Sequence, residues 1–198
     1  MKKLVNSIIT ICTVLALPSC QDDSAYQLQI RDEISNRIKY LQYNDESPFN
    51  RFDVPFQMPT YFSVDAEYRV NAKVERIEKR NYQIIGTSDE KTQRYLEFAW
   101  LHFKLKNRDH KLLVLKPIGL ADVGFFYLAF ADDTSGGLTY GGGRYLDISI
   151  GKSDKVVLDF NLAYNPYCAY VSDFSCPLPP SENILETAIL AGEKDFKK

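Results

Sequence analysis

The sequence predicts a mainly β domain of the α+β class: an antiparallel barrel or sandwich-like sheet preceded by one N-terminal amphipathic helix. From residue 68 onward, short segments alternate apolar and polar residues, which is typical of half-buried strands. Aromatic residues, which favour strands, make up 13% of the chain. Only residues 26–43 instead repeat apolar residues at helical spacing. Many short strands behind one leading helix are typical of a curled antiparallel sheet.

A connector that contains prolines follows the predicted helix. Its apolar positions recur near helical spacing at Leu28, Ile34, Ile38 and Leu41. The helix must end before Pro48, because the residue that precedes a proline avoids the helical region. Residues 48–61 combine prolines with aromatic residues, and we expect them to be an extended connector packed on the domain.

Strands are expected along the rest of the chain. The predicted segments are 68–77, 81–86, 94–105, 110–116, 124–131, 145–150 and 156–160, with a last short element at 184–190. The clearest hairpin joins 94–105 to 110–116 through a turn at 107–109. Segment 124–131 is continuously apolar, so we expect it to be a central strand.

The amino terminus has the features of an export signal. Lys2 and Lys3 precede an apolar stretch that is too short to span a bilayer, and a small residue stands before Cys20. The sequence Leu-Pro-Ser-Cys at 17–20 resembles the lipobox of bacterial lipoproteins. We therefore expect a signal peptide at 1–19, lipidation of Cys20, a tether at 20–25 and attachment to a membrane through acyl chains. The alternative is an ordinary secretory signal, or an uncleaved hydrophobic helix, with a chance cysteine.

The residues after Cys20 bear on localisation. Residues 21–23, Gln-Asp-Asp, resemble an acidic signal that directs some Gram-negative lipoproteins to the cell surface. The alternative is a solvated tether with no targeting role. Because Gln21 rather than an aspartate follows the cysteine, retention in the inner membrane is disfavoured. We expect a lipid-anchored protein of the cell envelope, at the outer membrane or cell surface of a Gram-negative bacterium.

Composition excludes some classes of partner. The chain has a formal net charge of −2, and loss of Lys2 and Lys3 with the signal makes it more acidic, so no nucleic-acid partner is expected. Its length suits one domain over 26–198. The chain has no Cys-x-x-Cys motif, and both histidines lie far from Cys168 and Cys176, so no metal site is predicted. The sequence indicates no cofactor.

Residues 130–183 carry the densest mixture of aromatic and polar residues. They include five glycines between 136 and 143 and an Asn-Pro turn. We predict a polar pocket with aromatic walls for a small-molecule ligand, and its candidate residues are Arg144, Tyr145, Asp159, Asn161, Tyr164, Asn165, Cys168, Tyr170, Glu182 and Asn183. Cys168 and Cys176 are eight residues apart, and they form either a disulfide or a thiol pair within a site. The alternative for the whole region is a structural clamp in which these polar groups satisfy a buried loop.

Four stretches of the chain resemble one known family. They read D-x-T-S-G-x-x-T-Y-G-x-G-R-Y-L at 132–146, L-D-F-N-x-A-Y-N-P-x-C-A-Y at 158–170, C-P-L-P-P-x-E-N at 176–183 and A-G-E-K at 191–194. Together they resemble the domain of unknown function 1684 family, in its short form. Tyr61-Phe62 through Tyr68-Arg69-Val70 resembles the family's upstream signature. The resemblance implies no activity. It does imply that members without export signals keep the cysteine pair, so that a disulfide is not its whole purpose.

Two functions follow as hypotheses. The first is an anchored lipoprotein that binds a small anionic ligand, which Arg144 would hold through its planar fork. The second is a small hydrolase- or transferase-like enzyme that uses the same pocket. In that enzyme Asp159 or Glu182 would be the acid or base and Cys168 a nucleophile.

Overall fold

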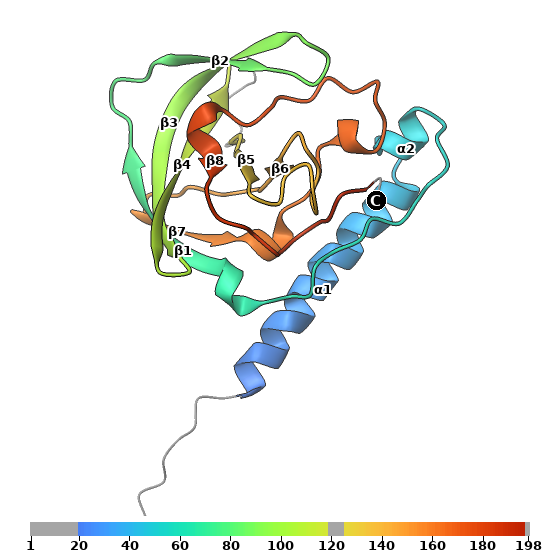
Figure 1. Ribbon diagram of the computed structural model, residues 1–198, viewed down its shortest axis with the longest axis horizontal. Coiled ribbons are helices and arrows are strands. Elements are labelled where there is room, and N and C mark those ends of the chain that lie inside the picture. The colour runs from blue at the N-terminus through green and yellow to red at the C-terminus, as the bar shows by residue number, and fades with distance from the viewer. Residues whose placement is uncertain (1–19, 119–124, 197–198) are drawn as a thin grey trace, which may run out of the picture.

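A computed structural model of the chain describes residues 20–118 and 125–196 (Figure 1). Its helices are α1 (Cys20–Tyr43) and α2 (Pro48–Arg51), with 3-10 turns η1 (Ala66–Tyr68), η2 (Phe160–Leu162), η3 (Tyr167–Ala169) and η4 (Ser181–Asn183). Its strands are β1 (Arg69–Arg76), β2 (Tyr82–Gly86), β3 (Thr92–Leu105), β4 (Arg108–Pro117), β5 (Ala129–Asp132), β6 (Arg144–Tyr145), β7 (Lys155–Asp159) and β8 (Ile184–Leu185). The predicted signal peptide, residues 1–19, lies outside the described residues.

The larger sheet is antiparallel and is built around the long strand β3. β4 pairs with one edge of β3, β1 and β2 share the other edge in succession, and β7 pairs with β1. The pairing of β3 with β4 shifts register between Glu97 and Ala99, a bulge that lets the sheet bend. The hairpin turn is tighter than predicted. Lys106 and Asn107, at positive φ, form a two-residue loop of the kind that matches strand twist.

A smaller sheet has the order β6-β5-β8, and β5 pairs antiparallel with β6 but parallel with β8. β5 is therefore central, as predicted, although it is shorter than the expected segment, of which residue 124 is outside the described part. The predicted strand 145–150 is reduced to β6, and the one at 184–190 to β8. The fold is thus mainly β with a leading helix, and the sheets do not close into a barrel.

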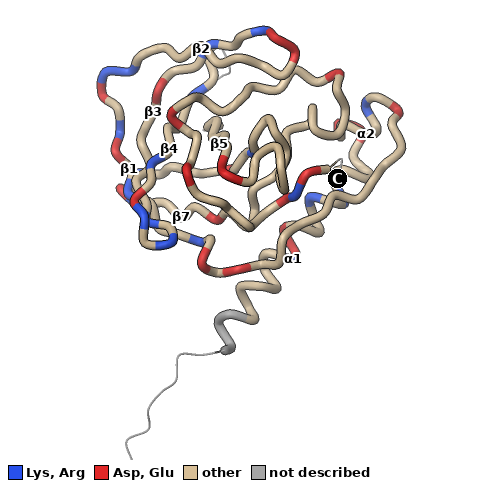
Figure 2. Tube along the Cα trace, in the orientation of Figure 1, with Lys and Arg blue, Asp and Glu red and all other residues tan. Residues whose placement is uncertain are grey.

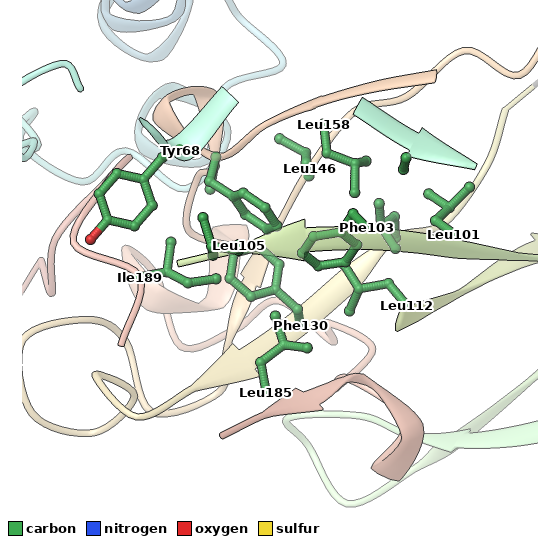
Figure 3. Packing of buried hydrophobic residues seen from close by; sticks show 14 of the residues in the cluster. Tyr68, Leu101, Phe103, Leu105, Leu112, Phe130, Leu146, Leu158, Leu185 and Ile189 are labelled. Carbon is green, nitrogen blue, oxygen red and sulfur yellow. The ribbon is translucent and has the colours of Figure 1, made fainter. Parts of the chain in front are cut away.

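The main core lies between the two sheets (Figure 3). Inward-facing residues of β1, β3 and β4 meet residues of β5, β7 and the C-terminal segment, among them Leu101, Phe103, Leu112, Phe130, Leu158 and Ile189. Phe130 packs edge-on against Phe160 at 5.2 Å between ring centroids, and Phe103 tilts against the same ring. The alternation that predicted these strands therefore reports their buried faces correctly.

Helix α1 packs along one side of the domain, and its N-terminal end projects away from it (Figure 1). The helix includes residues 20–25, which were predicted as a tether, so it starts earlier than the predicted helix at 26–43. Leu41 is buried and Ile34 and Ile38 are half-buried, as predicted, but Leu28 is 59% exposed and Ile30 is buried in its place. The connector also differs in part, because Pro48 begins one helical turn that Ser47 caps before the chain extends.

Neither helix in the described parts of the chain has the length and apolarity that a bilayer span requires.

Candidate functional site

Most of the sequence-predicted pocket residues fall into three sets of contacts within the described parts of the chain. Arg144 leads the first group, on β6 with 1% of its surface exposed. Its Nη2 atom donates to Asp132 Oδ2 at 2.7 Å and to the Ile189 carbonyl at 3.1 Å. Its Nη1 atom donates to the carbonyls of Ala191 and Glu193. The protein's own groups thus bind both terminal nitrogens of the guanidinium that was predicted to hold an anion, while its buried Nε has no hydrogen-bond partner among the described residues.

The second group joins Asp159 and Asn161 to helix α1. The hydroxyl of Tyr26 donates to the Asp159 carboxylate at 2.9 Å and accepts from Asn161 Nδ2 at 2.9 Å. Asn161 Nδ2 also donates to the Asp65 carbonyl, and Arg69 lies 3.6 Å from Asp159 Oδ2. Burial, with the Asp159 carboxylate beside it, raises the pKa of Tyr26 above its usual range, so the hydroxyl remains protonated as a donor. These residues hold α1 in place.

The third group surrounds Glu193, a fully buried carboxylate that the sequence analysis did not select. Tyr170 donates to Glu193 Oε1 at 2.5 Å, and Asn165 donates to both of its oxygens, from Nδ2 at 2.9 Å and from the backbone at 3.2 Å. Arg37 of α1 lies 3.9 Å from Oε2, and its guanidinium stacks on Tyr164 at 3.8 Å. Burial raises the pKa of Glu193, against the lowering effect of these partners.

The remaining candidates lie elsewhere. Asn183 is fully buried and ties β4 to β5 through hydrogen bonds with the backbone of Leu113 and Ala129. Tyr145 donates to the Pro177 carbonyl at 2.6 Å. Glu182 is exposed and contacts Gln83 and Ser181, so it does not share a site with Asp159 as an acid–base pair would. Glu182 and Asn183 are neighbours in the same motif, yet the side chain of Glu182 is exposed and that of Asn183 is buried.

Cys168 and Cys176 are free, buried thiols, so the structure contains no disulfide between them. They are nevertheless adjacent: Cys176 Sγ accepts from the Cys168 amide at 3.1 Å, and the Tyr140 hydroxyl lies 3.7 Å from Cys168 Sγ. The thiol of Cys176 hydrogen-bonds to Cys168, which lowers the pKa of Cys168, while the same bond and burial raise the pKa of Cys176. Cys168 is thus the thiol that ionises first.

We expect this pair to titrate unequally. Thiolate absorbance at 240 nm should rise in a first step below the usual thiol pKa of about 8.5. The Cys168→Ala variant should lose this step, and Cys176→Ala should return it towards the usual value, because the donor is gone. A pH titration of the reduced protein measures both. One shared step near the usual value, unchanged in Cys176→Ala, would contradict the assignment.

The sequence motifs contained the missed residues without marking them. Asp132 begins the first motif, which also holds its partner Arg144, whereas Glu193 lies in the last motif and its partner Asn165 in the second. A carboxylate flanked by small and apolar residues, as Glu193 is by Ala191 and Gly192, is a signal for burial that could have found it. In the described parts of the chain, no three acidic, histidine or cysteine side chains gather as metal ligands would.

Together these features define a class of protein: a single, mainly antiparallel domain whose loops are clamped by buried polar groups and whose leading helix is held by the same groups. The family described as Protein of unknown function (DUF1684) matches residues 55–194, and the chain belongs to that family. It is also similar to an uncharacterised protein of Haloarcula marismortui solved by solution NMR. That match has 35% identity and a TM-score of 0.68, and it covers 90% of this chain and 99% of the other. A search of curated proteins finds no match.

Proposed function

We propose that the protein is an exported lipoprotein, anchored through acyl chains on Cys20, whose helix α1 connects the anchor rigidly to a binding or scaffold domain. One observation carries the proposal. Helix α1 includes Cys20 and continues without a break to the residues that hold it in the domain. An anchor on a residue of such a helix would control the position of the whole domain relative to the membrane.

The contacts along α1 support a rigid connection. Tyr26, six residues after Cys20, donates a hydrogen bond to Asp159 in the body of the domain. Arg37 follows three turns later with Tyr164 and Glu193, and Tyr40 accepts from the Tyr167 hydroxyl at 3.1 Å. Leu41 is fully buried with Phe49 and Tyr170. These contacts are spread over nearly the whole helix, so α1 cannot swing without breaking several of them.

The motif residues therefore gain a role other than ligand binding. Asp159, Asn161, Tyr164 and Asn165 contact α1, and Arg144 fixes the C-terminal segment that carries Glu193. This arrangement favours the structural clamp over an anion pocket in residues 130–183. For the enzyme alternative, Cys168 needs a base, and its hydrogen-bonding neighbours are Tyr140, Cys176 and Ser88.

We propose the outer membrane or cell surface of a Gram-negative bacterium as the location.

The anchor is tested by metabolic labelling with a palmitate analogue in a Gram-negative host. The wild-type chain should incorporate label and remain with membranes in high salt, because two or three acyl chains bind essentially permanently. The Cys20→Ala variant should lose all label. The matched control is Cys12→Ala, within the predicted signal, which should keep full label. Label that persists in Cys20→Ala would overturn the proposal, and so would an unlabelled wild-type chain. Protease digestion of intact cells then distinguishes a domain exposed on the cell surface, which is cleaved, from one on the inner leaflet of the outer membrane, which is protected.

A further inference from the structure

The outward face of the larger sheet carries a row of basic side chains across four strands. Lys155 of β7 pairs in register with Lys73 of β1, Lys73 with His102 of β3, and His102 with Lys111 of β4. Directly opposed residues have Cβ atoms about 4.5–5.5 Å apart, and their side chains point to the same face. The row therefore places like charges side by side at neutral pH, at least between Lys73 and Lys155.

This juxtaposition costs stability unless a counter-charge offsets it, since like charges directly opposite one another destabilise a sheet. Two members of the row have neighbours of their own: Lys111 lies 4.2 Å over the Trp100 ring, and His102 contacts Glu75 at 2.7 Å. Lys73 and Lys155 are exposed, and within residues 20–118 and 125–196 neither makes an ion pair. Among the described residues, no counter-charge therefore pairs with Lys73 or Lys155.

These two lysines border a groove. An open groove of about 660 Å³ is lined by Asn71, Ala72, Lys73, His102, Phe103, Lys104, Asp109, His110 and Lys155. Three lysines face one aspartate there, although the whole chain is acidic. In Figure 2, basic positions on β1, β4 and β7 come together on the side of the domain where these strands lie. None of the residues proposed from the sequence as a pocket lines this groove.

We propose that this groove binds the phosphate groups of an anionic ligand, either a small phosphorylated metabolite or a lipid headgroup. Lysine favours phosphate as a compact point charge, whereas planar recognition of a carboxylate is the usual role of arginine, and the groove is lined by no arginine. Its volume is in the range of small-molecule sites and exceeds that of one phosphate. Lys73 and Lys155 hold one phosphate between them, and Lys104 with Asn71 contacts the rest of the ligand.

The site is tested on the full chain in a neutral detergent, with inorganic pyrophosphate and with monomeric dihexanoyl phosphatidylglycerol as separate probes. Binding is followed by calorimetry and by fluorescence of Trp100, the only tryptophan, which is two residues from His102 on the same face of β3. The test variant is Lys73→Gln with Lys155→Gln. Its matched control is Lys39→Gln with Lys79→Gln, which removes the same charge from exposed positions outside the groove.

At least one probe should bind the wild-type chain, and the test variant should weaken it at least tenfold while the control changes it less than twofold. The midpoint temperature of thermal unfolding should not be lower for the test variant than for the wild type, because a repulsive pair has been removed. Tighter binding of the lipid than of pyrophosphate identifies a headgroup as the source, and the reverse identifies a free phosphate compound. The proposal is overturned if neither probe binds, or if both double variants weaken binding equally. It does not depend on lipidation of Cys20.

Discussion

Replacement of Arg144 by methionine is expected to lower the free energy of unfolding by about 3–5 kcal/mol, the usual cost of breaking a buried ion pair from one side. The side chain is 1% exposed, and its partner Asp132 has a fully buried carboxylate. Without the guanidinium, that carboxylate keeps only neutral donors, from Thr134 and the Ile189 amide. The carbonyls of Ile189 and Ala191 lose their donor as well. An uncompensated buried charge and unpaired carbonyls both destabilise the folded state.

Urea denaturation of the Arg144→Met protein measures this loss. The matched control is Arg31→Met, at an exposed position of α1, which should stay within about 0.5 kcal/mol of the wild type. A fold as stable as the wild type would show that Arg144 does not clamp this part of the chain. The clamp would then be the wrong interpretation of this residue.

Substitution of alanine for Gly192 is expected to cost about 2–5 kcal/mol, the sum of a left-handed backbone and a steric overlap. Gly192 has φ +77°, a conformation that side chains with a Cβ disfavour. A Cβ atom there would lie 2.6 Å from the Ala163 carbonyl oxygen and 2.7 Å from that of Phe160. Both contacts are to backbone, so neither can rotate away. The shift would also displace Glu193 from Asn165 and Tyr170.

Alanine substitutions at two other glycines separate the cost of the left-handed backbone from the cost of the steric overlap. Gly136→Ala has a similar φ of +77° but only one atom, 4.0 Å away, near the added Cβ, so it should cost about 1–2 kcal/mol. Gly151→Ala meets no atom within 4 Å and has no positive φ, so it should be near neutral. The three unfolding curves should rank in this order. Equal losses at Gly192 and Gly136 would mean that the overlap relaxes and that only the backbone conformation matters.

Most of the fold could be predicted from periodicity. The β3–β4 hairpin and the inward faces of β1 and β3 follow from alternation, because burial of one face of a strand imposes a period of two. Element ends were less predictable. The expected strands at 145–150 and 184–190 shortened to two residues each, since their backbones pair briefly and then turn to carry loop contacts. The start of α1 was missed because polar residues 21–24 carry no periodic signal.

The site could not be predicted in the same way. The sequence singled out Arg144, Asp159 and Asn165 as polar residues in aromatic surroundings, and all three are buried as that composition suggests. Their partners, Asp132, Tyr26 and Glu193, are between 12 and 133 residues away along the chain. No local pattern encodes such distances. A residue that is well placed to bind an anion and one that clamps a loop therefore look alike in sequence.

The sequence by itself determined the class of fold, the family and the concentration of polar and aromatic residues in the last third of the chain, because burial periodicity and motif composition are local properties. Only the tertiary structure decided that these residues form a buried network and what that network does. It closes around the C-terminal segment and helix α1, and it leaves the unpaired lysines on the opposite face of the sheet. The physical reason is pairing: whether a charge is free or satisfied depends on which distant group the fold brings within hydrogen-bond distance.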